Sequence, residues 1–383
     1  MQVEVAHLSK LSLDDAFFNS LRDDYPEFNR WYKRVSASDR RAWIIRDPSH
    51  GIAALCILKV EHHGELINDQ GETLPDDFLK ICTLKVSDTG VRYGERMLYV
   101  AFSFAASMGL SSVYVQVRRG RHEHLQNLLK EYGFFEKGYY KFDICYVKEM
   151  RPGSRENNIS DEQGRLKYAI DYYPNFYDGP EARKFIISLT AQEFEVLFPD
   201  AKVRNLFLTQ EDRFLKGASN AIRKAFLREV GCKNLRIGDL LLFYQKSRER
   251  DLGRTVECLG IVESIERYGG VDEIETSLLR RIPLGSDSIC KLFAKSGYLI
   301  VVGFRLLKYF DRPIYRSELL SAGIEPNHRD VRLISEDSYQ RLHNVISTRD
   351  GIKRRSSTKS HFNRGSLKAV FDVWRSFFSF LRR

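Results

Sequence analysis

The chain has 383 residues, of which 43% are hydrophobic and 29% are charged, and this length and composition suffice for two folded domains. They exclude a protein that is disordered throughout. The formal net charge is +10, but residues 347–383 contain ten Lys and Arg against two Asp and Glu, so the remaining residues carry only +2. A near-neutral body excludes a protein that coats DNA through clustered cations, whereas a local basic patch remains open.

The cysteines and the N-terminal segment indicate a cytoplasmic protein. Six cysteines are scattered along the chain without a C-x-x-C pair, which argues against a disulfide scaffold and against a zinc site. The first ten residues lack the basic and apolar stretches of a signal peptide, and no apolar run approaches the roughly 20 residues of a membrane-spanning helix. We therefore expect cytoplasmic localisation and no metal ion.

Helices and strands alternate in residues 1–150, which predicts a mixed α/β domain with a central sheet. In chain order, the pattern predicts a helix over 13–34, strands over 42–46, 52–60 and 78–86, a long helix over 94–108, a strand over 112–117, a helix over 121–132 that ends at Gly133, and a strand over 139–147.

The rest of the chain is predicted to hold a linker, a strand-rich domain and a basic tail. Residues 151–167 form the expected linker, because 151–163 are polar, without an apolar period. Residues 168–346 form the expected second domain, with strands over 184–189, 239–244, 256–265 and 298–307 and a helix over 220–230. Residues 347–366 are expected to be a disordered basic linker, and 367–383 an amphipathic helix.

A strand, a short loop with two glycines and a long helix follow one another in residues 79–102. Such a turn can bind a diphosphate, because the amides and the positive dipole end of the helix face the loop. An ordinary strand-to-helix turn is the alternative interpretation of Gly90 and Gly94.

Residues 40–148 resemble the GNAT superfamily of acetyl-CoA-dependent N-acetyltransferases. The resemblance depends on the strand 79–86, the loop 89–94, the helix 94–108, the strand 112–117 and the helix that ends in Gly133-Phe134. It implies acetyl-CoA as the acetyl donor, with the end of the strand beside the pantetheine arm and backbone amides around the diphosphate. The residues so implied are Leu84, Lys85, Val86, Val91, Arg92, Tyr93, Gly94, Glu95 and Arg96.

The chain departs from the GNAT pattern at two places. In one alignment of the loop, Thr89 replaces the usual Gln or Arg and Arg92 replaces the middle glycine; in the other, Val91 and Arg96 occupy the outer positions. Leu129 stands where a tyrosine often serves as general acid, so no proton donor is identified.

Candidates for a general base are Glu61 and His63 at the end of a strand and His122 at the start of a helix. A base that takes a proton from an amine near pH 7 is commonly a histidine or a glutamate with a raised pKa. Solvated strand and helix ends are the alternative interpretation. His122 also follows basic residues 118–121, which could bind an anionic partner.

The second block resembles PUA-like domains of the EVE and ASCH type, through the order of its segments between 172 and 345. The resemblance implies a small β-barrel that binds RNA or modified nucleotides. An RNA-binding surface needs cations to contact phosphates and aromatic faces to stack on bases. The candidates are Arg223, Lys224, Tyr244, Lys246 and Arg281. The turn at Gly238-Asp239 is expected to be architectural, leading into a buried strand.

The apolar residues of 367–381 recur on one helical face, opposite arginines and lysines. This helix could dock on the protein's own surface, on a second copy or partner, or on an anionic membrane or RNA.

Together these features predict an acetyltransferase that modifies an amine, with a second domain that binds an RNA or a nucleotide-bearing substrate. The alternative is a non-catalytic RNA-binding or regulatory protein, of the kind found in toxin or defence systems, whose first domain has lost turnover. The departures at Leu129 and in the loop favour this alternative, whereas the intact order of strands and helices favours the enzyme.

Overall fold

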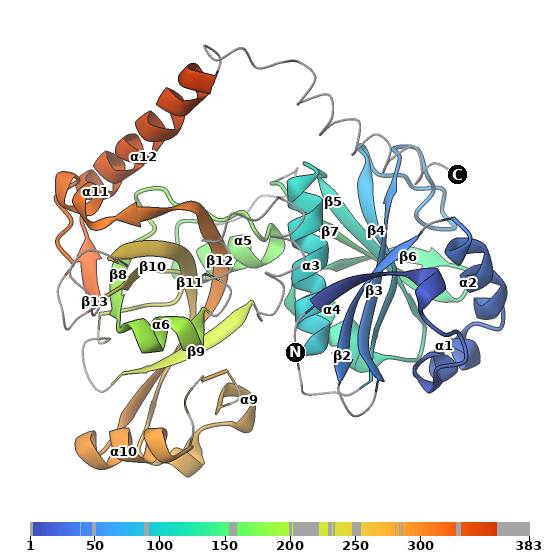
Figure 1. Cartoon of the computed structure of the whole chain (residues 1–383), viewed down its shortest axis with the longest axis horizontal. Helices are drawn as coiled ribbons and strands as arrows, with labels where there is room; N and C mark the ends of the chain where they lie inside the picture. The colour runs from blue at the N-terminus through green and yellow to red at the C-terminus, as the bar shows by residue number, and fades with distance from the viewer. Residues whose placement is uncertain are drawn as a thin grey trace. The chain divides into compact units, whose positions relative to one another are not determined.

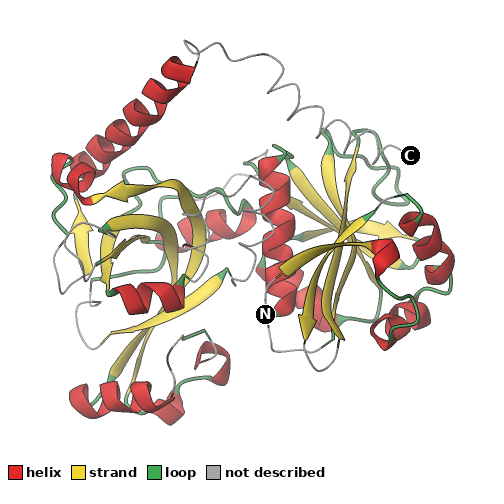
Figure 2. Ribbon diagram, in the orientation of Figure 1, coloured by secondary structure: helices red, strands yellow, loops and turns green. Residues whose placement is uncertain are grey.

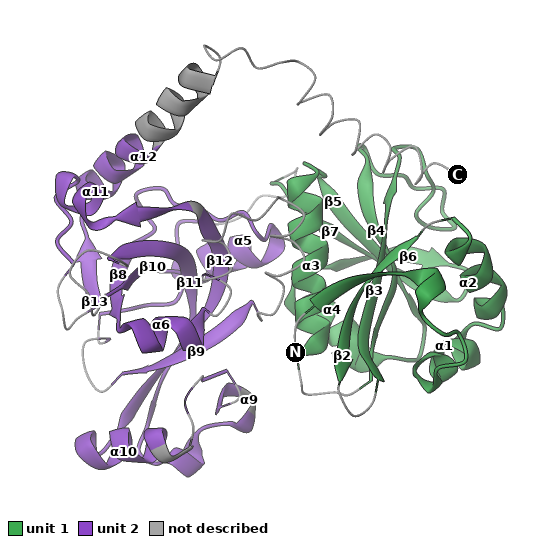
Figure 3. Ribbon diagram, viewed as in Figure 1, with its two compact units in different colours: residues 1–153, 207–219, 352–383 green, residues 154–206, 220–351 purple. Residues whose placement is uncertain are grey.

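The computed structural model of the chain describes residues 3–357 except 39, 48–50, 88–91, 153–158, 199–200, 202–221, 229–231, 233, 247–253, 280, 283, 285 and 327–330. Its contacts divide the chain into two compact units (Figure 3). Unit 1 comprises Met1–Gly153, Phe207–Ser219 and Ile352–Arg383, and unit 2 comprises Ser154–Leu206 and Asn220–Gly351. The expected C-terminal helix over 367–383 lies outside the described residues.

Unit 1 contains a seven-stranded mixed sheet with the strand order β1-β2-β3-β4-β5-β7-β6 (Figures 1 and 2). The strands are β1 (Val3–His7), β2 (Arg41–Asp47), β3 (Gly51–Glu61), β4 (Phe78–Val86), β5 (Ser112–Arg118), β6 (Phe135–Tyr140) and β7 (Asp143–Glu149). The helices are η1 (Leu8–Lys10), η2 (Ala16–Phe18), α1 (Asn19–Asp24), α2 (Phe28–Ser36), α3 (Tyr93–Ser107) and α4 (Glu123–Glu131). Only β4 and β5 pair in parallel, so the predicted mixed α/β domain is confirmed.

Helices cover both faces of this sheet, because its inner strands bury side chains on both sides. Ile44 of β2 packs in a core with Phe18 and Phe28 from the N-terminal helices. Its neighbour Trp43 points to the other face, where its ring meets Phe104 of α3 at a centroid distance of 5.6 Å. The near-continuous apolar runs of the central strands follow from this double burial.

Two predicted elements of unit 1 are divided in the structure. The helix expected over 13–34 is split into η2, α1 and α2, and the break between α1 and α2 includes Pro26, which cannot donate a helical hydrogen bond. The strand expected over 139–147 is a hairpin, β6 and β7, which turns at Lys141 with a φ of 54°. No glycine marked that turn in the sequence.

Unit 2 contains a six-stranded sheet with the strand order β13-β8-β10-β11-β12-β9. The strands are β8 (Lys184–Leu189), β9 (Arg223–Arg228), β10 (Leu240–Gln245), β11 (Thr255–Tyr268), β12 (Leu299–Tyr315) and β13 (Val331–Ile334). The helices are α5 (Glu162–Asp171), α6 (Ala191–Leu197), η3 (Val271–Glu273), α9 (Thr276–Leu279), α10 (Ser286–Ser296), α11 (Arg316–Ser321) and α12 (Glu336–Ser357).

The predicted β-rich second domain is confirmed, with a sheet that curves strongly (Figure 1). Three register irregularities interrupt the ladder between the long strands β11 and β12, and such bulges bend a sheet. The concave core contains the rings of Phe243 and Phe304, 4.7 Å apart, with Phe198 beside them. Within the described residues no ladder joins the end strands β13 and β9, so the expected barrel is not closed there.

One prediction for this part of the chain is wrong, and two expected linkers overlap with described helices. Residues 223–228 form the strand β9 rather than a helix, because Phe226 packs in one core while Ala225 and Leu227 pack in another; a run buried on both faces has no diagnostic period. Helix α5 occupies part of the expected linker 151–167. Helix α12 continues to Ser357, through the first part of the expected basic linker.

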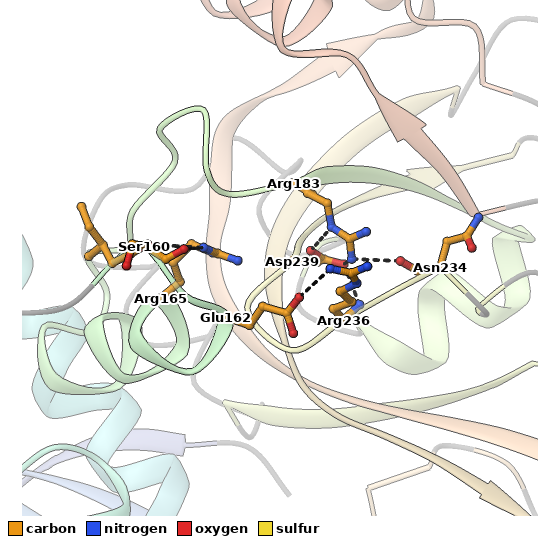
Figure 4. Close-up of polar contacts among 8 residues, drawn as sticks. Ser160, Glu162, Arg165, Arg183, Asn234, Arg236 and Asp239 are labelled. Atoms are coloured by element: carbon orange, nitrogen blue, oxygen red, sulfur yellow. Dashed lines mark hydrogen bonds and ion pairs between the residues drawn. The ribbon is translucent and has the colours of Figure 1, made fainter.

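Contacts beside the Gly238-Asp239 turn join α5 to unit 2, among them the ion pair of Arg236 with Glu162 of α5 at 3.1 Å (Figure 4). Gly238 has a φ of +80°, and a Cβ at this position would lie 2.5 Å from the Glu162 carbonyl oxygen at the start of α5. Asp239 is fully buried, and Arg183 donates to both of its carboxylate oxygens, at 2.9 and 2.6 Å. Burial raises the pKa of the Asp239 carboxyl despite this arginine. The pair and the turn are architectural, as the sequence indicated.

Within the described residues, no helix is long and apolar enough to cross a membrane. The same part of the chain contains no group of three His, Cys, Asp or Glu side chains that could hold a metal ion. The six cysteines form no disulfide with one another.

Replacing Gly238 with Ala should destabilise unit 2 more than the same change at Gly297. Both glycines have positive φ, at +80° and +70°, but the space around Gly297 is open, whereas Gly238 touches backbone. Backbone strain alone costs about 1 kcal/mol, and the clash adds roughly 2 kcal/mol. Urea denaturation of the two variants measures the difference; equal losses of unfolding free energy would contradict the close approach of α5.

Candidate functional site

Strands β4 and β5 separate from one another in the middle of the sheet of unit 1. Their ladder comprises three rungs, from Leu79 opposite Val113 to Ile81 opposite Val115. β4 nevertheless continues to Val86 and remains paired with β3 to Ala54, and β5 continues to Arg118 beside β7. Because the two strands are parallel, their C-terminal ends diverge at the same edge of the sheet. We call this gap the β4–β5 opening.

A single β-bulge accounts for the opening. On the other side of β4, Ile57 of β3 pairs with Thr83 but Leu58 pairs with Ile81, so Cys82 is an extra residue in the ladder. A bulge bends its strand and increases the local twist. The bulge immediately follows Ile81, the last residue of the β4–β5 ladder, and it therefore turns the end of β4 away from β5.

The predicted donor-binding residues meet at this end of the sheet. Leu84, Lys85 and Val86 form the end of β4, past the bulge; Arg92 immediately precedes α3, and Tyr93 is its first residue. The remaining predicted positions in this part of the chain, Gly94, Glu95 and Arg96, lie in the first turn of α3, whose amide groups point out of the helix N-terminus. The predicted contact at Val91 lies outside the described residues.

The start of α3 is packed tightly against α4. A Cβ at Gly94 would lie 2.8 Å from Cδ2 of Leu128, so the absence of a side chain allows the two helices to approach each other. Arg92, just before the helix, has a φ of 60°, a left-handed conformation that is uncommon for a residue with a side chain. Tyr93 and Glu95 are buried, so these two positions would contact a ligand through the backbone rather than through exposed side chains.

Lys85 connects β4 to the N-terminal helices. Its Nζ bonds the hydroxyl of Ser20 in α1 and lies 5.0 Å from the ring centre of Phe17. Burial lowers the pKa of Lys85, and the neighbouring carboxylate of Asp24 partly opposes that change. The Lys85 side chain is therefore directed to α1, and its expected contribution to donor binding falls to its backbone.

Asp24, at the end of α1, anchors the loop between β5 and α4. Its side chain is only 4% exposed, His122 Nε2 lies 2.7 Å from its Oδ2, and Arg121 Nη1 bonds its Oδ1. Burial raises the pKa of Asp24, but the hydrogen bonds from Arg121 and His122 outweigh burial and hold that pKa below its ordinary value. We call Asp24, Arg121 and His122 the Asp24 cluster.

A second group of charges lies beside the cluster at the ends of β5 and β7. Arg118 Nη1 is 3.7 Å from Asp143 Oδ1, and the Arg118 guanidinium lies over the ring of Tyr25, 5.6 Å from its centre. Burial and the carboxylates of Asp143 and Asp24 raise the pKa of Tyr25 to about 12. Burial also raises the pKa of Asp143, despite Arg118.

Of the three predicted bases, only His122 belongs to the Asp24 cluster. Glu61 pairs with Phe78 at the start of β4, four residues and about 13 Å before the bulge, and its carboxylate accepts from Lys59 Nζ at 2.6 Å. His63 is exposed, and its contacts in the described structure are with Asp77. The structure therefore does not bring Glu61 or His63 together with His122.

Sequence reasoning missed Asp24 and Tyr25, and it noted Arg121 only as part of the basic run 118–121. Asp24 lies in a short charged helix end that resembles a solvated surface, and its partner His122 is 98 residues away in the chain. No local sequence pattern predicts a contact between residues so far apart. The basic run before His122 was the one signal in the sequence that an acidic group could lie near this loop.

The predicted RNA-binding residues of unit 2 are dispersed, and two of them are buried. Lys224 is 7% exposed and donates to the Leu197 carbonyl at 2.8 Å, and Tyr244 is 4% exposed. The structure therefore places these two predicted residues inside a sheet that is covered on both faces. Arg223 forms an ion pair with Glu263 at 2.9 Å. Lys246 and Arg281 are partly exposed.

No protein-family model and no curated protein matches the chain. Its structural neighbours include an ASCH protein from Zymomonas mobilis, with 13% identity over 42% of this chain and 94% of the other and a TM-score of 0.32. They also include a GNAT-family acetyltransferase from Listeria monocytogenes, with 15% identity over 38% of this chain and 94% of the other and a TM-score of 0.25. An aminoglycoside 6'-N-acetyltransferase complexed with coenzyme A has 15% identity over 40% of this chain and all of its own, with a TM-score of 0.30.

Replacing Asp24 with Asn should destabilise the protein in a pH-dependent manner. Because the pKa of Asp24 is below its ordinary value of 3.8 in the folded state, its stabilisation is present above about pH 4 and is lost as the pH falls through the folded-state pKa. We expect a loss of roughly 2 kcal/mol in unfolding free energy at pH 7.

Chemical denaturation at pH 7, 5, 4 and 3 measures this loss. The adjacent exposed carboxylate gives a matched control, and Asp23→Asn should change the unfolding free energy by about 0.5 kcal/mol or less. A cost of Asp24→Asn that stays constant down to pH 3 would show that the carboxylate's charge is not what stabilises the contact.

Proposed function

We propose that unit 1 binds acetyl-CoA at the β4–β5 opening and transfers its acetyl group to an amine. The observation that carries this proposal is that the β4–β5 ladder ends at the Cys82 bulge, whereas β4 continues unpaired with β5 to Val86 and α3 begins at Tyr93. An extended molecule with amide groups can pair with a strand edge, and a helix N-terminus favours a diphosphate. The pantetheine arm and the diphosphate of acetyl-CoA have these two properties.

The chain's own groups would hold the donor mainly through backbone. The main chain of Leu84, Lys85 and Val86 would face the pantetheine arm, and the first-turn amides of α3 would face the diphosphate. The close approach at Gly94 fits this assignment, because a side chain there would disturb the packing of α4 beside the helix start. When bound, acetyl-CoA supplies an activated acetyl group, and the backbone amides near the bulge can polarise its carbonyl.

Calorimetric titration with acetyl-CoA tests donor binding. Wild type should bind saturably, and Gly94→Trp should weaken binding at least tenfold, because the indole would displace Leu128 and obstruct the start of α3. Ala106→Trp is the control, since Ala106 is exposed near the other end of the same helix, and this variant should bind as wild type does.

The melting temperatures of the two Trp variants, measured alongside binding, separate loss of the site from loss of the fold. No heat of binding from the folded wild type would overturn the acetyltransferase proposal. Release of the CoA thiol with a panel of amine acceptors would then establish turnover.

The alternative of a non-catalytic first unit has one observation in its favour. Leu129, at the position where the GNAT resemblance places a proton-donating tyrosine, is fully buried in α4. Tyr132 is also buried and packs against Phe102, with ring centres 6.4 Å apart. Acetyl-CoA binding without thiol release for any acceptor would support this alternative.

We further propose that unit 2 binds RNA or a nucleotide-bearing substrate, with the partly exposed cations Lys246 and Arg281 among its phosphate contacts. Each phosphate contact contributes roughly 0.7 to the slope of log affinity against log salt for single strands. We therefore expect Lys246→Ala and Arg281→Ala each to reduce this slope by about that amount in anisotropy titrations with single-stranded RNA. Lys291→Ala, an exposed lysine of α10, is the control and should leave the slope unchanged. Absence of RNA binding by wild type would overturn this proposal.

A further inference from the structure

The Asp24 cluster combines a buried carboxylate with a partly exposed imidazole. The Asp24 side chain is 4% exposed, whereas the His122 side chain is 39% exposed. The separation of 2.7 Å between His122 Nε2 and Asp24 Oδ2 is that of a short charge-assisted hydrogen bond. In the described part of the chain, the His122 ring makes no other hydrogen bond or ion pair, so Nδ1 is not engaged by another protein group there.

The backbone at His122 supports the same interpretation. His122 has a φ of 57°, in the left-handed region, at the residue that precedes α4. This conformation costs roughly 1 kcal/mol for a residue with a side chain and persists where the surroundings fix it. The contact with Asp24 is such a constraint, because it ties the β5–α4 loop to α1.

The cluster lies at the β4–β5 opening rather than at a remote surface. Asp24 influences Lys85, which is on the part of β4 past the bulge, and Lys85 in turn bonds Ser20 of the same helix as Asp24. On the other side, Arg121 and His122 follow the end of β5. Helix α1 thus contacts Lys85 of β4 through Ser20 and the loop that follows β5 through Asp24.

We infer that Asp24 is a positioning residue that holds His122 as the proton acceptor for the incoming amine. The inference rests on the acetyl transfer proposed for unit 1. A carboxylate that accepts from Nε2–H fixes the imidazole in the Nε2–H tautomer and leaves the lone pair on Nδ1. Arg121, on the other carboxylate oxygen, keeps Asp24 ionised and so maintains that tautomer.

The proton transfer completes the chemistry of acetyl transfer. The nitrogen lone pair forms the new N–C bond, the C–S bond breaks with its electrons on sulfur, and the extra proton on nitrogen passes to Nδ1 of His122. The imidazolium then returns this proton to the departing thiolate or to water. No oxidant, reductant or further reactant is needed.

Several charged groups from the surrounding elements lie around the Asp24 cluster. Asp24 contacts His122, and Arg121 contacts Asp24. Lys85 of β4 interacts electrostatically with Asp24. Arg118 of β5 and Asp143 of β7 interact with Tyr25, which in turn interacts with Asp24.

The first test measures the tautomer of His122 without requiring activity. Nitrogen-15 spectra of the imidazole in the full chain, assigned with His122→Gln, should show the Nε2–H form for wild type and a mixture of tautomers for Asp24→Asn. His124→Gln is the matched control, because His124 is exposed and its removal should not change the signals of His122. An Nδ1–H tautomer in wild type would overturn the inference even if acetyl-CoA binds.

The second test is the pH profile of kcat/KM with an acceptor that supports turnover. Asp24→Asn and His122→Gln should each lower kcat/KM about 100-fold at pH 7, with KM for acetyl-CoA unchanged, and Asp24→Glu should recover part of the loss. Asp23→Asn should match wild type. A merely structural role for Asp24 would lower the amount of active enzyme without changing the shape of the pH profile, and that result would overturn the inference. Failure of wild type to bind acetyl-CoA would instead overturn the proposed function.

Discussion

One extra residue in a β-ladder determines the geometry of unit 1. The Cys82 bulge shifts the pairing of β3 with β4 and coincides with the end of the β4–β5 ladder. Without that shift, parallel strands of this length would remain hydrogen-bonded along their common extent and leave no strand edge inside the sheet. Because of the bulge, backbone groups at the end of β4 that would ordinarily pair with β5 are left unpaired with that strand. These groups belong to the strand that precedes α3 in the chain.

Segments from distant parts of the sequence supply the polar side chains around the β4–β5 opening. α1 brings Asp24, the loop after β5 brings Arg121 and His122, and β4 brings Lys85. The buried carboxylate of Asp24 is stable there because two cationic or hydrogen-bonding partners offset its desolvation. Stability and chemistry therefore depend on the same contact, and a variant at Asp24 has to be examined for both.

Unit 2 shows how double burial removes the signals on which sequence reasoning depends. The prediction of a helix over 220–230 failed because β9 lies in a sheet with cores on both faces, so its apolar residues show no alternation that would indicate a strand. Lys224 is buried in the same strand, and its Nζ donates to the Leu197 carbonyl. By contrast, Gly238-Asp239 was interpreted correctly, because a glycine with positive φ before a buried strand is a local requirement.

The sequence by itself determined the order of the elements from β2 to α4 in unit 1, the strand and helix on either side of the loop before Gly94, and the β-rich character of unit 2. These properties follow from periodicity and turn chemistry within a few residues. Only the tertiary structure decided where the β4–β5 ladder ends, that Glu61 and His63 are away from His122, and that Asp24 holds the imidazole. Register shifts and contacts between residues 98 positions apart depend on how whole elements pack, and no short segment of the chain encodes that packing.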